Sequence, residues 1–125
     1  MSIRSFLIDE HGPARDIRAR RLEPAHGLEV VGSTSDSEAA IREIVTLCPD
    51  LVLIDTKMKQ TDGMDVCRQV LGAGEQIKVA VLTSYLDPDE RRQACEARVE
   101  GYLPKIVDTH SLSGWIRLAV KRKPT

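Results

Sequence analysis

The chain has 125 residues, of which 42% are hydrophobic and 30% are charged, and its formal net charge is −1. This size suits one compact domain with one core, and the small net charge gives no reason to expect general binding to nucleic acid or to a membrane. No apolar run approaches the roughly 18 residues that a membrane span needs.

Apolar runs of strand length alternate with segments of helical period along the whole chain. The predicted strands are residues 2–8, 28–32, 51–54, 78–83 and 101–104. The predicted helices are residues 12–22, 35–48, 63–71, 87–98 and 111–123. Because neighbouring parallel strands need a crossover that usually holds a helix, this alternation predicts an α/β domain with a parallel sheet.

Two of the predicted helices carry capping signals. Ser35 or Asp36 can cap the second helix, and Pro49 ends it. Asp87 can cap the fourth helix, with Pro88 at its first position. The helical period predicts that the second helix turns one apolar face inward, made of Ala40, Ile41, Ile44, Val45 and Cys48.

The three cysteines and the start of the chain indicate a cytoplasmic protein. Cys48, Cys67 and Cys95 lie far apart and show no metal-binding spacing, so we expect reduced thiols in the core. The apolar run in "MSIRSFLIDEHG" is too short for a signal peptide.

The stretch "ARDIRARR" places several arginines on the first predicted helix. We expect most of them to form a solvated charged face, since exposed charges of this kind contribute little to stability. These arginines are Arg15, Arg18, Arg20 and Arg21.

Polar side chains follow four of the five predicted strands. They are Asp9 and Glu10 after the first strand, Asp55 after the third, Thr83 and Ser84 at the end of the fourth, and Lys105 after the fifth. The carboxyl ends of parallel strands meet at one edge of the sheet, where ligands bind in such folds. We therefore expect these side chains to share one shallow pocket.

Three carboxylates in one pocket repel one another. At about 4 Å, with an effective dielectric constant near 20, each pair costs roughly 4 kcal/mol. One lysine cannot neutralise three such charges, so either a pKa rises or a divalent cation binds. Oxygen ligands suit Mg²⁺, which pairs with phosphate, and the pattern predicts Asp55 as a nucleophile toward a phosphoryl group. The alternative is that acids at strand ends are ordinary solvated loop residues.

Several stretches in this order and spacing resemble the receiver domain of two-component response regulators. They are "FLIDEHG", "PDLVLIDTKMKQTDGMDVC", "KVAVLTSY" and "GYLPK". The stretches "IDEH", "LEVVG" and "LTSYLD" are most similar to the NarL/LuxR-type transcription regulators. The resemblance implies a flavodoxin-like, doubly wound (βα)5 three-layer sandwich with strand order 2-1-3-4-5, two helices on one face and three on the other.

The resemblance also implies roles for the residues of the pocket. A histidine kinase would phosphorylate Asp55. The implied Mg²⁺ ligands are Asp9, Glu10, Asp55 and the main-chain carbonyl of Lys57. The implied phosphoryl-binding and switch residues are Thr83, Ser84, Tyr102 and Lys105.

The same resemblance suggests how the chain is organised and what it binds. Residues 1–121 would form the receiver domain, and residues 122–125 a basic tail or the start of a linker. A homodimer would form through the fourth helix, the fifth strand and the fifth helix. DNA would be bound only by an output domain outside this chain, and no membrane would be involved.

The sequence departs from the family pattern at Glu10, Lys59, Arg98 and Ile106. Arg98 stands where glycine is common, and arginine would be strained in a left-handed turn. Lys57 and Lys59 flank the pocket, and we expect both to point to solvent. These departures leave open a degenerate pseudo-receiver that acts as a phosphorylation-independent interaction module.

Two further alternatives are weaker. Phosphatases with an aspartate nucleophile carry a second acid two residues later, where this chain has Lys57. A flavin-binding flavodoxin needs a Ser/Thr-Gly phosphate loop after the first strand, and the sequence has none there.

Overall fold

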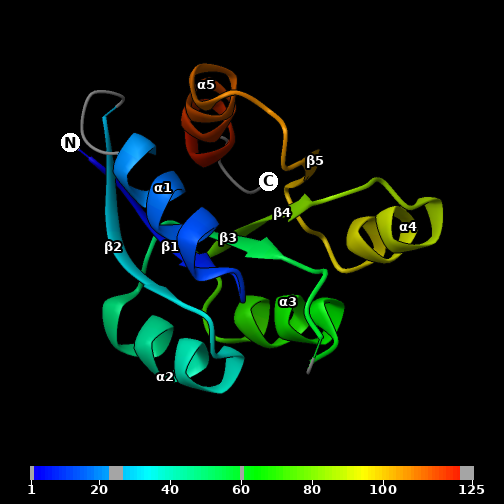
Figure 1. Cartoon of the computed structure of the whole chain (residues 1–125). Helices are drawn as coiled ribbons and strands as arrows, with labels where there is room; N and C mark the ends of the chain where they lie inside the picture. The colour runs from blue at the N-terminus through cyan, green and yellow to red at the C-terminus, as the bar shows by residue number, and fades with distance from the viewer. Residues whose placement is uncertain (1, 23–26, 60, 122–125) are drawn as a thin grey trace.

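The computed structural model describes residues 2–22, 27–59 and 61–121. It contains one five-stranded parallel sheet whose order, β2-β1-β3-β4-β5, confirms the predicted fold (Figure 1). The strands are β1 (Ile3–Ile8), β2 (Leu28–Thr34), β3 (Leu51–Asp55), β4 (Lys78–Thr83) and β5 (Gly101–Pro104). The helices are α1 (Gly12–Leu22), α2 (Ser37–Leu47), α3 (Gly63–Gly72), α4 (Pro88–Glu96) and α5 (Thr109–Lys121). The predicted tail, residues 122–125, lies outside the described residues.

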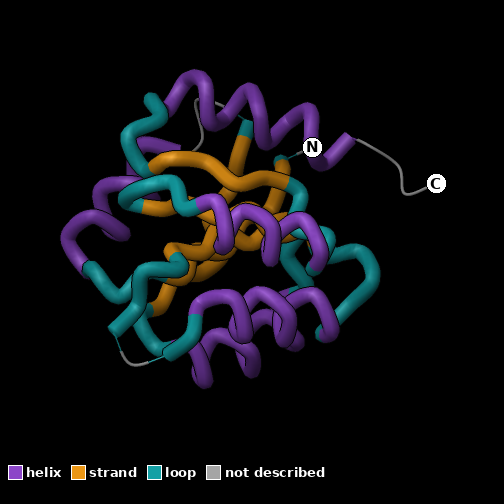
Figure 2. Tube along the Cα trace, turned by 90° about the vertical axis from the view of Figure 1, so that its right-hand side faces the viewer, coloured by secondary structure: helices purple, strands orange, loops and turns teal. Residues whose placement is uncertain are grey.

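Two helical layers cover the sheet, as the three-layer prediction requires (Figure 2). Alternate residues of each strand point to opposite faces. Leu7 and Leu53 therefore pack in a core with α1 and α5, while Phe6 and Ile8 pack in a second core with α2, α3 and α4. None of the helices within the described ranges has the length and apolar character that a membrane span requires.

The predicted inner face of α2 is partly wrong. Asp36 caps the helix, and its Oδ1 atom accepts hydrogen bonds from the amides of Glu38 and Ala39. Val45 is 56% exposed, and Cys48 is also exposed. The helix ends at Leu47, which packs against the core, and Cys48 turns out of the helix with a φ of 48°. The helix therefore ends one residue before Cys48, and the helical period does not carry the Cys48 side chain to the inner face.

Only one of the three predicted core thiols is buried. Cys67 on α3 lies in the core, whereas Cys48 and Cys95 are exposed. Burial, with the nearby carboxylate of Glu90 as a lesser cause, raises the pKa of the Cys67 thiol to about 12. This thiol is therefore protonated at neutral pH.

Arg98 adopts the left-handed backbone conformation that its place before β5 predicted, with a φ of 67°. This conformation costs a non-glycine residue roughly 1–2 kcal/mol. We expect Arg98→Gly to raise the free energy of unfolding by about 0.5 kcal/mol, because relief of this strain exceeds the added freedom of the unfolded chain. Urea denaturation measures the change. Arg98→Ala removes the same charge but keeps the strain, so equal stabilisation by alanine would contradict this explanation.

Candidate functional site

One lysine joins two acids at the carboxyl edge of the sheet. The Nζ atom of Lys105 donates hydrogen bonds to Oδ2 of Asp9 and to Oδ2 of Asp55, each at 2.9 Å. The two acids follow or end the adjacent strands β1 and β3 and are only 6% and 7% exposed. The structure thus brings together these three residues, which the sequence placed at the ends of three different strands.

Both carboxylates are fully engaged. The second oxygen of Asp9, Oδ1, accepts a hydrogen bond from the amide of His11 at 2.8 Å. The second oxygen of Asp55 accepts one from the amide of Lys57 at 3.0 Å. Burial acts to lower the pKa of Lys105, but its hydrogen bonds to the two acids outweigh burial and raise it. Because a buried charge is stable only when it is paired, these two bonds keep the Lys105 ammonium group charged at neutral pH.

Glu10, the third acid, makes a different contact. Its Oε1 atom accepts a hydrogen bond from the main-chain amide of Lys59 at 2.7 Å, which ties the loop after β1 to the loop after β3. Across the described ranges, no three His, Cys, Asp or Glu side chains form a group that could hold a metal ion. The Mg²⁺ ligand set therefore stays a prediction.

The Thr83 hydroxyl is turned toward the loop between β4 and α4. Thr83 is fully buried, and its Oγ1 atom donates a hydrogen bond to the carbonyl of Tyr85 at 2.8 Å. The Thr83 carbonyl accepts a bond from the amide of Lys105 at 2.7 Å, which aligns the ends of β4 and β5. Ser84 is exposed.

A comparison with protein families identifies the domain that holds this site. Residues 6–117 match the response regulator receiver domain. The chain belongs to this family. The receiver domain is 35% identical to the transcriptional regulatory protein LiaR of Bacillus subtilis over 122 residues, which are 98% of this chain and 58% of that protein. It is 31% identical to the response regulator protein VraR of Staphylococcus aureus over 117 residues, 94% of this chain and 56% of that protein.

The receiver domain also resembles solved structures over nearly its whole length. A response regulator receiver domain protein from Clostridium thermocellum superposes with a TM-score of 0.86 at 28% identity, covering 98% of this chain and 96% of that one. A LuxR-family two-component response regulator from Aurantimonas sp. SI85-9A1 gives a TM-score of 0.87 at 24% identity, covering 96% of this chain and 86% of that one. The second likeness supports the fold alone.

Two arginines of α1 lie at the site of the receiver domain, although we expected most of the arginines of this helix to form a solvated face. Nη1 of Arg15 donates to the carbonyl of Asp9 at 2.7 Å, and Nη2 of Arg18 donates to the carbonyl of Lys105 at 3.5 Å. Both arginines line a narrow cavity together with Asp9 and Asp55. Burial lowers the pKa of Arg18, and the two acids oppose this shift. Asp9 and Asp55 therefore lie near three cations, which are Lys105, Arg15 and Arg18. The spacing of three residues between Arg15 and Arg18 puts both on one face of the helix, and this spacing could have predicted that they lie together.

A second polar cluster lies against the loop that follows Asp55, and its centre is Glu90 on α4. Glu90 accepts hydrogen bonds from Thr56 Oγ1 at 2.7 Å, Lys57 Nζ at 3.2 Å and the Tyr102 hydroxyl at 2.9 Å. Lys57 Nζ also lies 4.3 Å from the ring centroid of Tyr85. The prediction that Lys57 points to solvent is therefore wrong, because α4 places a carboxylate within its reach.

These contacts shift two pKa values upward. Burial acts to lower the pKa of Lys57, but the hydrogen bond and charge of Glu90 outweigh it and raise the pKa. Burial raises the pKa of the Tyr102 hydroxyl, and the bond to Glu90 adds to that shift. Lys57 is therefore a cation and Tyr102 a neutral donor at neutral pH.

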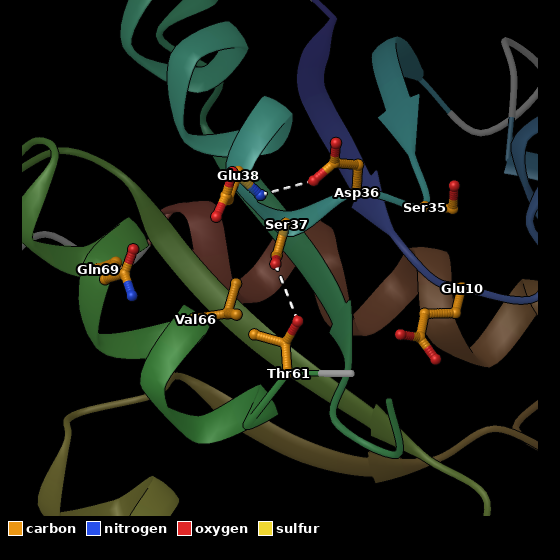
Figure 3. A pocket seen from close by; sticks show the side chains of 8 residues that line it. All are labelled: Glu10, Ser35, Asp36, Ser37, Glu38, Thr61, Val66 and Gln69. Atoms are coloured by element: carbon orange, nitrogen blue, oxygen red, sulfur yellow. Dashed lines mark hydrogen bonds between the residues drawn. The ribbon is translucent and has the colours of Figure 1, made fainter. Parts of the chain in front are cut away.

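A hollow of about 680 Å³ opens on the other side of the site, between the start of α2 and α3 (Figure 3). Figure 3 shows Glu10 on one side of this hollow and Gln69 on the other, with the 3.3 Å hydrogen bond between Ser37 and Thr61 lying between them. Glu10 is thus reached by solvent from this side, whereas Asp9 and Asp55 are almost fully covered.

Proposed function

We propose that the chain is the receiver domain of a response regulator that a histidine kinase phosphorylates on Asp55. The observation that carries the proposal is the shared ammonium group of Lys105. It binds Asp55 and Asp9 at 2.9 Å each, inside a domain of the receiver family. The Asp55 carboxylate thus stands next to a fixed cation that can also pair with phosphoryl oxygens.

The proposed reaction moves one phosphoryl group. A carboxylate oxygen of Asp55 attacks the phosphorus atom of a phosphohistidine on the kinase, and an acyl phosphate forms. The phosphorus–nitrogen bond breaks, its electron pair stays on the imidazole nitrogen, and that nitrogen takes up a proton from solvent. The receiver domain itself would promote this transfer and the later slow hydrolysis, in which water takes the phosphoryl group from Asp55 and releases it as inorganic phosphate.

The new charge would be met by residues already at the site. A phosphoryl group adds about 1.5–2 negative charges and strong hydrogen-bond acceptors. Lys105 can pair with it directly, and Thr83 can exchange its bond to the Tyr85 carbonyl for one to a phosphoryl oxygen. Ser84 lies beside Thr83 at the end of β4, and Tyr102 on β5 completes the proposed switch.

The donor set suits Mg²⁺. Asp9, Glu10, Asp55 and the main-chain carbonyl of Lys57 would hold it, and all are oxygen ligands, which this cation prefers. Glu10 already reaches the loop that carries Lys57, through its bond to the amide of Lys59. When bound, Mg²⁺ would supply positive charge to the phosphoryl oxygens.

The output of the switch would lie in a part of the protein outside these residues. The chain spans a little over half the length of LiaR and VraR, and LiaR is named a transcriptional regulatory protein. We infer that this receiver domain controls transcription in the cytoplasm through a DNA-binding output domain. A homodimer through α4, β5 and α5 would convey the signal.

Intact mass after treatment with acetyl phosphate and Mg²⁺ tests the acceptor. We expect the unaltered protein to gain the mass of one phosphoryl group and Asp55→Asn to gain none. Asp65→Asn is the control, because Asp65 is an exposed acid on α3 that pairs only with Arg68 in the described structure. No gain by the unaltered protein would favour the pseudo-receiver, and a full gain by Asp55→Asn would place the acceptor elsewhere.

A further inference from the structure

Glu90 joins three parts of the domain that are far apart in sequence. Its carboxylate accepts hydrogen bonds from Thr56 and Lys57 after β3 and from Tyr102 on β5. The side chain is only 15% exposed, and that of Lys57 is 21% exposed. The N-cap residue Asp87 fixes the first turn of α4, since its Oδ1 atom accepts bonds from the amides of Asp89 and Glu90. Glu90 is therefore held in place on both its main-chain and side-chain atoms.

The contacts of Glu90 are stronger than those of an ordinary ion pair on the protein surface. On the same helix, Arg92 and Asp89 form an ion pair at 3.5 Å with side chains that are 67% and 78% exposed. Exposed pairs of that kind contribute little. Glu90 instead accepts three hydrogen bonds in a largely covered place, and hydrogen bonds to ionised groups are about twice as strong as neutral ones.

Glu90 holds residues that lie next to the groups expected to rearrange when Asp55 is phosphorylated. Thr56 and Lys57 directly follow Asp55, and the Lys57 amide donates to Oδ1 of Asp55. The Thr83 hydroxyl is bound to the Tyr85 carbonyl, and Lys57 lies over the Tyr85 ring. For Thr83 to bond a phosphoryl oxygen, its hydroxyl must release the Tyr85 carbonyl, which removes one of the contacts that hold the loop before α4.

We propose that Glu90 is a positioning residue that tethers the loop after Asp55 to α4 and Tyr102 and so stabilises the unphosphorylated arrangement. This inference rests on the proposed function. Loss of the carboxylate charge frees Lys57 and loosens Tyr102, whose hydroxyl also accepts a bond from the Asp87 amide at 3.1 Å. The rearrangement then costs less, and a phosphoryl group at Asp55 is bound more tightly.

Titration with beryllofluoride in the presence of Mg²⁺ tests the tether. Trp115, the only tryptophan, is a suitable fluorescent reporter because its ring packs against the backbone of Gly101, next to Tyr102. We expect Glu90→Gln to lower the Kd for beryllofluoride about tenfold, the effect of losing charge-assisted hydrogen bonds. Glu96→Gln removes the same charge from an exposed position on α4 and should leave the Kd unchanged.

A double-mutant cycle separates a tether from a purely structural role. Tyr102→Phe should give a smaller decrease in Kd than Glu90→Gln, and the two together should give less than the sum of their effects on binding free energy. Fully additive effects, or a lower melting temperature of Glu90→Gln with an unchanged Kd, would overturn the proposal. If Glu90→Gln does not fold, Thr56→Val removes one donor to the same carboxylate and should shift the Kd in the same direction.

The outcomes for the tether and for the proposed function are distinct. No response of the unaltered protein to beryllofluoride would overturn the proposed function and, with it, the tether. A response of the unaltered protein with an identical Kd in Glu90→Gln would overturn the tether alone.

Discussion

Lys105→Met is expected to lower the free energy of unfolding by about 3 kcal/mol at pH 7, because one partner of a buried ion cluster is removed. Asp9 and Asp55 would remain 6% and 7% exposed without the ammonium group that they share. Arg15 and Arg18 remain near the two acids, so we expect the loss of unfolding free energy to lie at the low end of the range for a broken buried ion pair. Chemical denaturation of the two proteins measures the difference.

The pH dependence of stability gives this prediction a second readout. The folded state raises the pKa of Lys105 above its ordinary value of 10.5. A raised pKa means that the folded state holds this proton more tightly, so the stabilisation is fully present below pH 10.5 and is lost as the pH rises through the raised value. This alkaline loss should be present in the unaltered protein and absent in Lys105→Met.

Lys59→Met is the matched control for this prediction. It makes the same chemical change at an exposed side chain in the loop after β3, and the bond from Lys59 to Glu10 comes from the main-chain amide, which the substitution keeps. We expect this substitution to change the free energy of unfolding by no more than about 0.5 kcal/mol, as most surface substitutions do. Equal losses in the two variants would show that the shared ammonium group has no special role in stability.

The fold and the centre of the site could be predicted because both depend on regular geometry. Alternation of apolar runs and helical segments leaves few arrangements other than a parallel sheet with helical crossovers. In such a sheet, adjacent strands end at the same edge, so Asp9 after β1 and Asp55 at the end of β3 must lie close together. Lys105 follows from the same rule, since β5 ends at that edge too.

The surroundings of the site could not be predicted in the same way. Arg18 and Lys57 have long side chains, and their direction depends on which neighbour offers an acceptor. Lys57 and Glu90 are 33 residues apart, and their contact depends on how α4 docks on the sheet, which no periodicity specifies. Glu90 is also one of two acids in the first turn of α4, and nothing in the sequence distinguishes it from Asp89.

Gly63→Ala is expected to cost about 3 kcal/mol of unfolding free energy, the upper part of the range for overpacking. Gly63 begins α3, and a Cβ atom on it would lie 2.4 Å from Cα and 2.6 Å from the carbonyl oxygen of Thr56. These are backbone atoms, so no rotamer change relieves the clash. Either α3 or the loop after Asp55 must move. Chemical denaturation measures the cost, and beryllofluoride titration shows whether the site moves with it.

Gly72→Ala provides the comparison within the same helix. Gly72 is the last residue of α3, and a Cβ atom there would meet no atom within 4 Å. Alanine is also the better helix former by roughly 1 kcal/mol, so Gly72→Ala should be neutral or stabilising. If Gly63→Ala were equally harmless, the loop after Asp55 would be free to move away from α3. A loop that moves freely would not be held by Glu90, so this result would also contradict the tether. The Gly63→Ala and Glu90→Gln experiments therefore test the same loop, the first through its contact with α3 and the second through its contact with α4.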